Sequence, residues 1–189
     1  MHDRAPTIRE FFSPKVFSVR KVAALALLLA IRAILGLPPL TFYFGQNFKV
    51  FTFAYITDAL AAMYFGPIAA IAFAFVGDFL GFLASSGLGG PYFPGFAISE
   101  MVTCFLFACF FYKRKITAPR VIFAWLLNLA IVIIGLNPLW LIIMYGRSAG
   151  EAYAFIRIIV NAAQSPLHIF ILYWLLTLIR GLNLERYLR

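Results

Sequence analysis

Apolar runs long enough to cross a lipid bilayer fill most of this 189-residue chain. A transmembrane helix needs about 20 predominantly apolar residues. By this criterion the sequence predicts six spans, at 17–36, 48–65, 66–86, 96–112, 119–144 and 154–180. Only 12% of the residues are charged, compared with about 25% in soluble domains. We therefore expect an all-α integral membrane protein, with residues 1–189 forming a single transmembrane domain.

The distribution of positive charge predicts which loops face the cytoplasm. Lysine and arginine are enriched in cytoplasmic loops. Twelve of the sixteen lie in the N-terminal segment, between the fourth and fifth spans, or at the C-terminal end. With six spans these three segments share one side, so both termini are expected to be cytoplasmic. The charges are too scattered for a nucleic-acid-binding face.

The other four basic residues are expected near the outer side of the membrane: Arg32, Lys49, Arg147 and Arg157. Each one alone is explained by a side chain that extends to the lipid headgroups or pairs with a neighbour such as Glu151. Positive charge on the outer side nevertheless opposes the topology rule. Their shared position therefore favours an outward-facing site for an anion.

The sixth span carries Arg157, Asn161, Gln164 and His168 at intervals of four, three and four residues. This spacing places them on one helix face over about three turns. Polar side chains are costly in contact with lipid, so this face is expected to point inward. Interhelical hydrogen bonding is the alternative explanation, and it suits His168 best. We interpret the face as one wall of a ligand pocket, near a kink at Pro166.

Further candidate residues lie in the other spans and in the outer loops. Asp78 lies between two glycines in "GDFLG", and Trp125 is one turn from Asn128 in the fifth span. Asp58 and Glu100 are also within or at the ends of spans, and Asp58 is expected to make a structural contact.

The loops at 36–49 and 85–96 are rich in Gly, Pro and aromatic residues. They suit a lid with Tyr43 and Tyr92 as aromatic walls, or else an aromatic belt at the membrane interface.

Several motifs of catalysis are absent from the sequence. It contains no phosphate-binding P-loop, no H-E-x-x-H, no nucleophile elbow and no Cys/His metal cluster. Cys104 and Cys109 are expected to be packing residues. We expect no enzymatic activity, no cofactor and no metal. The predicted ligand is flat, polar and partly anionic.

Three segments carry a resemblance to a known family. Ala26 and Ala30 form an A-x-x-x-A pair in "AALALLLAIRAILG". The stretch "YFGPIAAIAFAFVGDFLGFL" covers the third span, and "GPYFPGF" precedes the fourth. With these motifs the whole chain resembles the substrate-binding S component of energy-coupling-factor (ECF) vitamin transporters, and within it the folate-specific group.

The resemblance implies a six-helix protein of a prokaryotic plasma membrane that captures folate from outside. It implies partners, namely a transmembrane T component and two cytoplasmic ATPase subunits, and delivery by reorientation in the membrane. Ala26 and Ala30 match the surface that meets the T component. The pterin of folate would suit Asn161, Gln164, and Asn128 or Asp78, and its anionic tail would suit one of the four outer cations.

Two alternatives stay open. The chain could be an S component for another vitamin such as riboflavin or pantothenate, although riboflavin would leave several cations without a carboxylate partner. It could also be an unrelated membrane enzyme or a structural subunit. For an enzyme, Asp78 with His168 is the one candidate catalytic pair, and nothing in their spacing brings them together.

Overall fold

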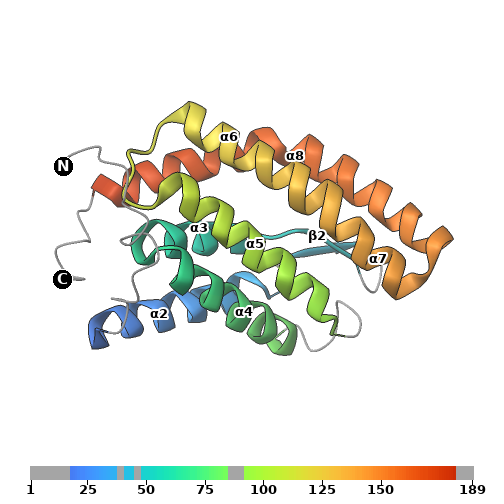
Figure 1. Cartoon of the computed structure of the whole chain (residues 1–189), viewed down its shortest axis with the longest axis horizontal. Coiled ribbons are helices and arrows are strands. Elements are labelled where there is room, and N and C mark those ends of the chain that lie inside the picture. Colours follow the sequence, from blue (N-terminus) through green and yellow to red (C-terminus); the bar gives the residue numbers. More distant parts are fainter. Residues whose placement is uncertain (1–17, 38–40, 45–47, 85–91, 182–189) are drawn as a thin grey trace.

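The computed structural model describes residues 18–37, 41–44, 48–84 and 92–181. Within these ranges the chain is helical apart from one short β-hairpin (Figure 1). The elements are α2 (Val19–Leu35), β1 (Phe42–Phe44), β2 (Phe48–Phe51), α3 (Ala54–Phe65), α4 (Pro67–Ala84), α5 (Pro94–Phe111), α6 (Ala118–Asn128), η1 (Leu129–Leu136), α7 (Asn137–Tyr145) and α8 (Arg147–Gly181).

The described ranges contain the six predicted helices, because α6, η1 and α7 follow one another without a break and form one long helix. Its middle part, η1, has π-helical hydrogen bonding, which in other proteins often marks a functional site. The tight turn predicted around Gly66 is also present, with Gly66 at a φ of +85° between α3 and α4. The last helix, α8, begins seven residues before the predicted start at 154.

The second span was predicted too long, because 48–51 forms a strand and α3 begins only at Ala54. β1 and β2 pair antiparallel, with Tyr43 opposite Lys49. The Thr41 hydroxyl donates to the Leu35 carbonyl at the end of α2, and lies 3.2 Å from the Thr52 hydroxyl. Hydropathy alone could not separate this strand from the helix, since aromatic and β-branched residues raise the apolar character of both.

α3 is the central helix of the bundle. At about 1.5 Å per residue, its twelve residues span about 18 Å, less than the hydrocarbon thickness of a bilayer. Ten of the twelve are buried. Neighbours surround it, because α2, α4, α5 and α8 all contact α3. A helix that is apolar over most of its surface belongs inside a protein, and α3 occupies that position with its one acid, Asp58, paired to Arg32.

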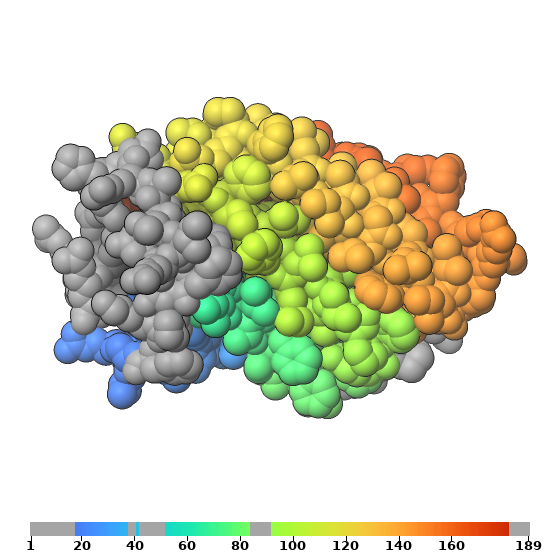
Figure 2. Space-filling view, in the orientation of Figure 1, coloured from blue at the N-terminus to red at the C-terminus, as the bar shows by residue number. Residues whose placement is uncertain are grey.

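The other helices surround α3 and leave apolar side chains on the outside. In Figure 1, α5 crosses in front of α3, between α4 and the α6–η1–α7 helix. Figure 2 shows that side chains of α5 fill the space between these neighbours. The core under α5 is closed by residues with essentially no exposed surface, including Phe107, Phe111, Leu172 and Leu176.

The outer surface is unlike that of a water-soluble protein. Large apolar side chains are exposed along α2, α4, α6, α7 and α8, among them Leu27, Phe75, Phe123, Ile143, Phe155 and Phe170. Large exposed apolar patches mark membrane or protein contacts. In the described part of the chain, three helices are long and apolar enough to cross a bilayer: Pro94–Phe111, Ala118–Tyr145 and Arg147–Gly181. The surface and these helices fit a protein embedded in lipid.

Close packing of α7 against the start of α8 gives the first testable prediction. A Cβ atom on Gly150 would lie 2.5 Å from Ile142 Cα and 2.7 Å from the Leu141 carbonyl oxygen. Since both contacts are backbone atoms, Gly150→Ala should force the helices apart and lower the free energy of unfolding by about 1–3 kcal/mol. Thermal unfolding of the purified protein in detergent measures the change.

Gly81→Ala is the matched control for this prediction. Gly81 lies inside α4, and a Cβ there would have no atom within 4 Å. Alanine is the better helix former, so this change should raise stability by about 0.5–1 kcal/mol. Equal effects of the two substitutions would contradict the close approach of α7 and α8.

Candidate functional site

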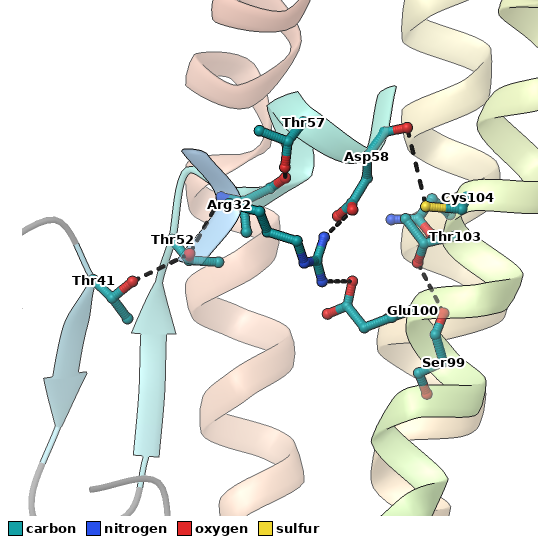
Figure 3. Close-up of polar contacts among 11 residues, drawn as sticks. Arg32, Thr41, Thr52, Thr57, Asp58, Ser99, Glu100, Thr103 and Cys104 are labelled. Carbon is teal, nitrogen blue, oxygen red and sulfur yellow. Dashed lines mark hydrogen bonds and ion pairs between the residues drawn. The ribbon is translucent and has the colours of Figure 1, made fainter. Parts of the chain in front are cut away.

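Arg32 is the centre of a buried ionic network. Its guanidinium pairs with Asp58 on α3 and, at 3.3 Å, with Glu100 on α5 (Figure 3). Arg32 is 5% exposed and Asp58 is 1% exposed. Asp58 thus makes the structural contact predicted for it. Arg32 makes the ion pairs of the alternative interpretation, and for that reason we leave it out of the ligand-binding residues proposed below.

The path of Arg32 explains one glycine of the "GDFLG" motif. A Cβ on Gly77 would lie 2.5 Å from Arg32 Nε and 2.6 Å from its Cδ. The guanidinium carbon lies 5.9 Å from the centroid of the Phe73 ring, on the same face of α4. Gly77 therefore gives room to a side chain from α2. The second glycine, Gly81, has no such neighbour.

Arg157 lies at the same level of the bundle, on α8. Its guanidinium carbon lies 5.4 Å from the centroid of the Phe96 ring. Phe96 precedes Glu100 by one helical turn on α5, so Arg157 lies near the Glu100 carboxylate. Arg157 is half-buried. Like Arg32 beside Phe73, Arg157 lies beside an aromatic ring of a neighbouring helix.

Two of the other residues of this α8 face bond to their own helix. The Asn161 amide donates to the Arg157 carbonyl at 2.8 Å, and His168 Nδ1 lies 3.0 Å from the Gln164 carbonyl. Gln164 differs, because its Oε1 is buried and has no hydrogen-bond partner among the described residues. A buried acceptor without a donor is rare in proteins. The face therefore offers one free acceptor two turns from a cation.

His168, Trp125 and Asn128 belong to a packed layer between α3, α5, α6 and α8. The His168 ring stacks on Trp125, with centroids 4.7 Å apart. Trp125 Nε1 donates to the Ser165 hydroxyl at 3.0 Å. The Thr103 hydroxyl donates to Asn128 Oδ1 at 2.9 Å. Asn128 and Trp125 are buried. His168 thus contacts a neighbouring helix by ring stacking, while its hydrogen bond to the Gln164 carbonyl stays within α8. The hydrogen bonds to Ser165 and from Thr103 hold Trp125 and Asn128 in fixed positions.

Asp78 and Tyr92 come together at the other end of α4. The Tyr92 hydroxyl donates to the Asp78 carboxylate. Burial, together with the nearby Asp78 charge, raises the pKa of the Tyr92 hydroxyl above its usual value of 10.0. Tyr92 also contacts the rings of Phe79 and Phe82. The segment before α5 is thus fastened to α4 by one hydrogen bond and two ring contacts.

The remaining candidates are dispersed. Arg147 is 88% exposed on its side chain and pairs with Glu151, the neighbour named as its alternative partner. Tyr43 lies on the hairpin, whose second strand contacts α8. Ala26 and Ala30 are exposed on α2. Residues 85–91 lie outside the described part of the chain, as do the basic residues before 18 and after 181.

Sequence reasoning identified the ionisable residues but missed how they pair. It also missed Ser99, which accepts a hydrogen bond from Trp140 Nε1, and Ser165. The signal for the ion pairs was present, because Arg32, Asp58 and Glu100 all lie in apolar spans. Charges in such spans normally pair with one another. Nothing comparable marked the two serines, which are common in membrane helices.

The chain is similar in sequence to a known family and to two folate transporters. The family described as "ECF transporter, substrate-specific component" matches residues 20–176. The folate transporter FolT of Leuconostoc mesenteroides subsp. mesenteroides is 31% identical over 175 residues, which are 90% of this chain and 91% of that protein. FolT of Clostridium novyi (strain NT) is 31% identical over 121 residues, 64% of this chain and 69% of that protein.

A solved structure supports the same relationship. The crystal structure of FolT bound with folic acid matches with a TM-score of 0.72 and 30% sequence identity. The match covers 83% of this chain and 91% of that one. The chain belongs to the family of substrate-specific S components of ECF transporters.

Proposed function

We propose that this chain is the high-affinity folate-binding subunit of an ATP-driven ECF uptake transporter. The observation that carries the proposal is the likeness to FolT with bound folic acid, at 30% identity over 83% of this chain. In this proposal the chain captures folate from the extracellular side. A T component and two ATPase subunits then drive its reorientation in the membrane and the release of the vitamin inside.

The polar face of α8 supports folate as the ligand. The free Oε1 of Gln164 is an acceptor for the N–H groups on the edge of a pterin. Arg157 lies seven residues earlier, which is about 10 Å along a helix, and its guanidinium suits a carboxylate of the glutamate tail. Asn161 lies between them. Tyr43 and Tyr92 remain proposed aromatic walls of the entrance, and Asp78 is proposed to hold Tyr92 there.

The layer behind this face supports it as a fixed binding surface. Trp125 donates a hydrogen bond to Ser165 on α8, and Asn128 accepts one from Thr103 on α5, so these bonds tie together the helices that carry the site. A site held in this way loses little conformational freedom when a ligand binds. We propose that Trp125 and Asn128 keep the binding surface rigid even where they do not touch the vitamin.

The proposed orientation places both termini in the cytoplasm. Twelve of the sixteen basic residues are then on the cytoplasmic side, as the charge rule requires. The exposed Ala26 and Ala30 of α2 are the proposed contact with the T component, since small side chains allow close helix approach in a membrane.

Folate binding to the purified chain tests the proposed function. Saturable one-to-one quenching of tryptophan fluorescence is expected with folate, and no saturable change with riboflavin or thiamine. Isothermal titration calorimetry measures the stoichiometry independently, because its signal does not depend on the absorbance of folate. Of the three tryptophans, Trp125 is buried beside the proposed site and Trp174 is exposed on the outer side of α8. Trp174→Phe should therefore keep most of the quenching, whereas Trp125→Phe should lose much of it.

Two results would contradict the proposal in different ways. Saturable binding of another vitamin without binding of folate would keep the transporter family but remove folate as the ligand. Failure of folded protein to bind any of the three vitamins would remove the proposed subunit function altogether.

A further inference from the structure

Four charged side chains from four helices form a connected and electrically neutral group. Arg32 on α2 pairs with Asp58 on α3 and Glu100 on α5. Arg157 on α8 lies over the Phe96 ring, one helical turn before Glu100 on the same face of α5, which places its cation near the Glu100 carboxylate. Two positive and two negative charges therefore balance in the interior of the bundle. Glu100 is the member that both arginines share.

The two acids of this group have different roles. Asp58 is 1% exposed on its side chain and pairs closely with Arg32. Glu100 is 34% exposed on its side chain and lies 3.3 Å from Arg32, a longer and more accessible contact. Since Asp58 already balances Arg32, the charge of Glu100 is the one that balances Arg157. Figure 3 shows Asp58 and Glu100 on different sides of the Arg32 guanidinium.

We propose that Glu100 is the internal counter-ion of Arg157 and that a carboxylate of the ligand takes its place when the ligand binds. This inference rests on the proposed function. It goes further, because it assigns Glu100 a role in selecting ligands by charge. Without ligand, Glu100 spares the bundle an uncompensated cation, which is costly in a membrane interior. With ligand, Arg157 turns to the incoming carboxylate and Glu100 remains with Arg32.

This exchange makes Glu100 a competitor of anionic ligands. Its attraction to Arg157 must be overcome by each carboxylate that binds there, whereas a neutral ligand has no such competition. The Phe96 ring keeps Arg157 at its place during the exchange, since the guanidinium rests over the ring and not on Glu100 alone. Glu100 thus lowers the affinity for anions while it keeps the empty site stable.

Glu100→Gln tests the exchange, because it removes the charge and keeps the size and an acceptor for Arg32. Folate should bind about tenfold more tightly to this variant, a change of about 1.4 kcal/mol. The neutral ligand 6-hydroxymethylpterin should bind as it does to the unchanged chain. Glu100→Asp keeps the charge and should restore weaker folate binding. Glu151→Gln, which makes the same charge change at the exposed start of α8, should have no effect.

An equal loss of folate and pterin affinity in Glu100→Gln would overturn the inference, because Glu100 would then be a structural or pterin-binding residue. An unchanged folate affinity would overturn it as well. If the unchanged chain does not bind folate, the proposed function fails first. The link between Glu100 and Arg157 is then tested by thermal unfolding of Glu100→Gln, Arg157→Gln and the double variant. Additive effects on the midpoint would remove the link, and coupled effects would support it.

Discussion

Arg32→Leu is expected to lower the free energy of unfolding by about 3–5 kcal/mol, the effect of leaving a buried charge without its partner. In this variant the Asp58 carboxylate, 1% exposed, would have no cation to balance it. Asp58 lies on α3, which is buried by its neighbours on nearly every side, so its carboxylate cannot turn outward to water. Unfolding in a series of denaturing detergent mixtures, followed by circular dichroism, measures the change.

Two further variants separate the charge effect from the loss of side-chain packing. Arg32→Leu combined with Asp58→Leu removes both charges, and it should recover much of the lost stability, because apolar pairs often replace buried ion pairs without cost. Arg147→Leu breaks the exposed pair with Glu151, whose side chains are 88% and 57% exposed. Exposed pairs contribute about 0–1 kcal/mol. If Arg32→Leu were no more harmful than Arg147→Leu, the buried network would not stabilise the fold.

The six helices could be predicted from sequence because lipid imposes a simple rule. Every backbone polar group in the hydrocarbon must be bonded internally, so long apolar runs become helices. The helix predicted at 119–144 is found as α6, η1 and α7 from Ala118 to Tyr145. The rule fails for a short apolar strand, since strands and helices share the same apolar residue types. That is why 48–53 was assigned to a helix although 48–51 forms a strand.

The candidate site was predictable only in part. The spacing of Arg157, Asn161 and Gln164 along one helix follows from helical geometry alone. Which cation stays available to a ligand does not, because that depends on contacts between helices far apart in sequence. Arg32 and Glu100 are 68 positions apart and still form an ion pair. Helical periodicity places a residue on a face, but it does not say which neighbour lies opposite.

Arg157→Gln is expected to weaken folate binding by about 100-fold, because removing one partner of a desolvated charge pair costs about 2–5 kcal/mol. The substitution removes the positive charge that we propose to hold the glutamate tail, and it keeps a shorter polar side chain with hydrogen-bond donors. Calorimetry with folate and with neutral 6-hydroxymethylpterin measures the effect. Only folate should lose affinity, since the pterin has no carboxylate to hold.

Two controls accompany this substitution: one removes another cation of the same helix, and the other keeps the charge at position 157. Arg147→Gln removes an exposed cation from the start of α8 and should leave folate affinity unchanged. Arg157→Lys keeps the charge but loses the two-pronged contact of a guanidinium, so an intermediate affinity is expected. A loss of pterin binding equal to that of folate would show that Arg157 supports the shape of the site and does not bind the tail.

Arg157→Gln should weaken folate binding and Glu100→Gln should strengthen it. The double variant then decides between two mechanisms. If Glu100 competes with the ligand for Arg157, Glu100→Gln strengthens folate binding only while Arg157 is present. The double variant should then bind folate as weakly as Arg157→Gln alone. If Glu100 instead repels the ligand's carboxylate directly, its removal should strengthen binding by the same factor in both backgrounds. The position of Arg157 over Phe96, one helical turn from Glu100, favours the first result, in which the arginine carries the whole effect of its counter-ion.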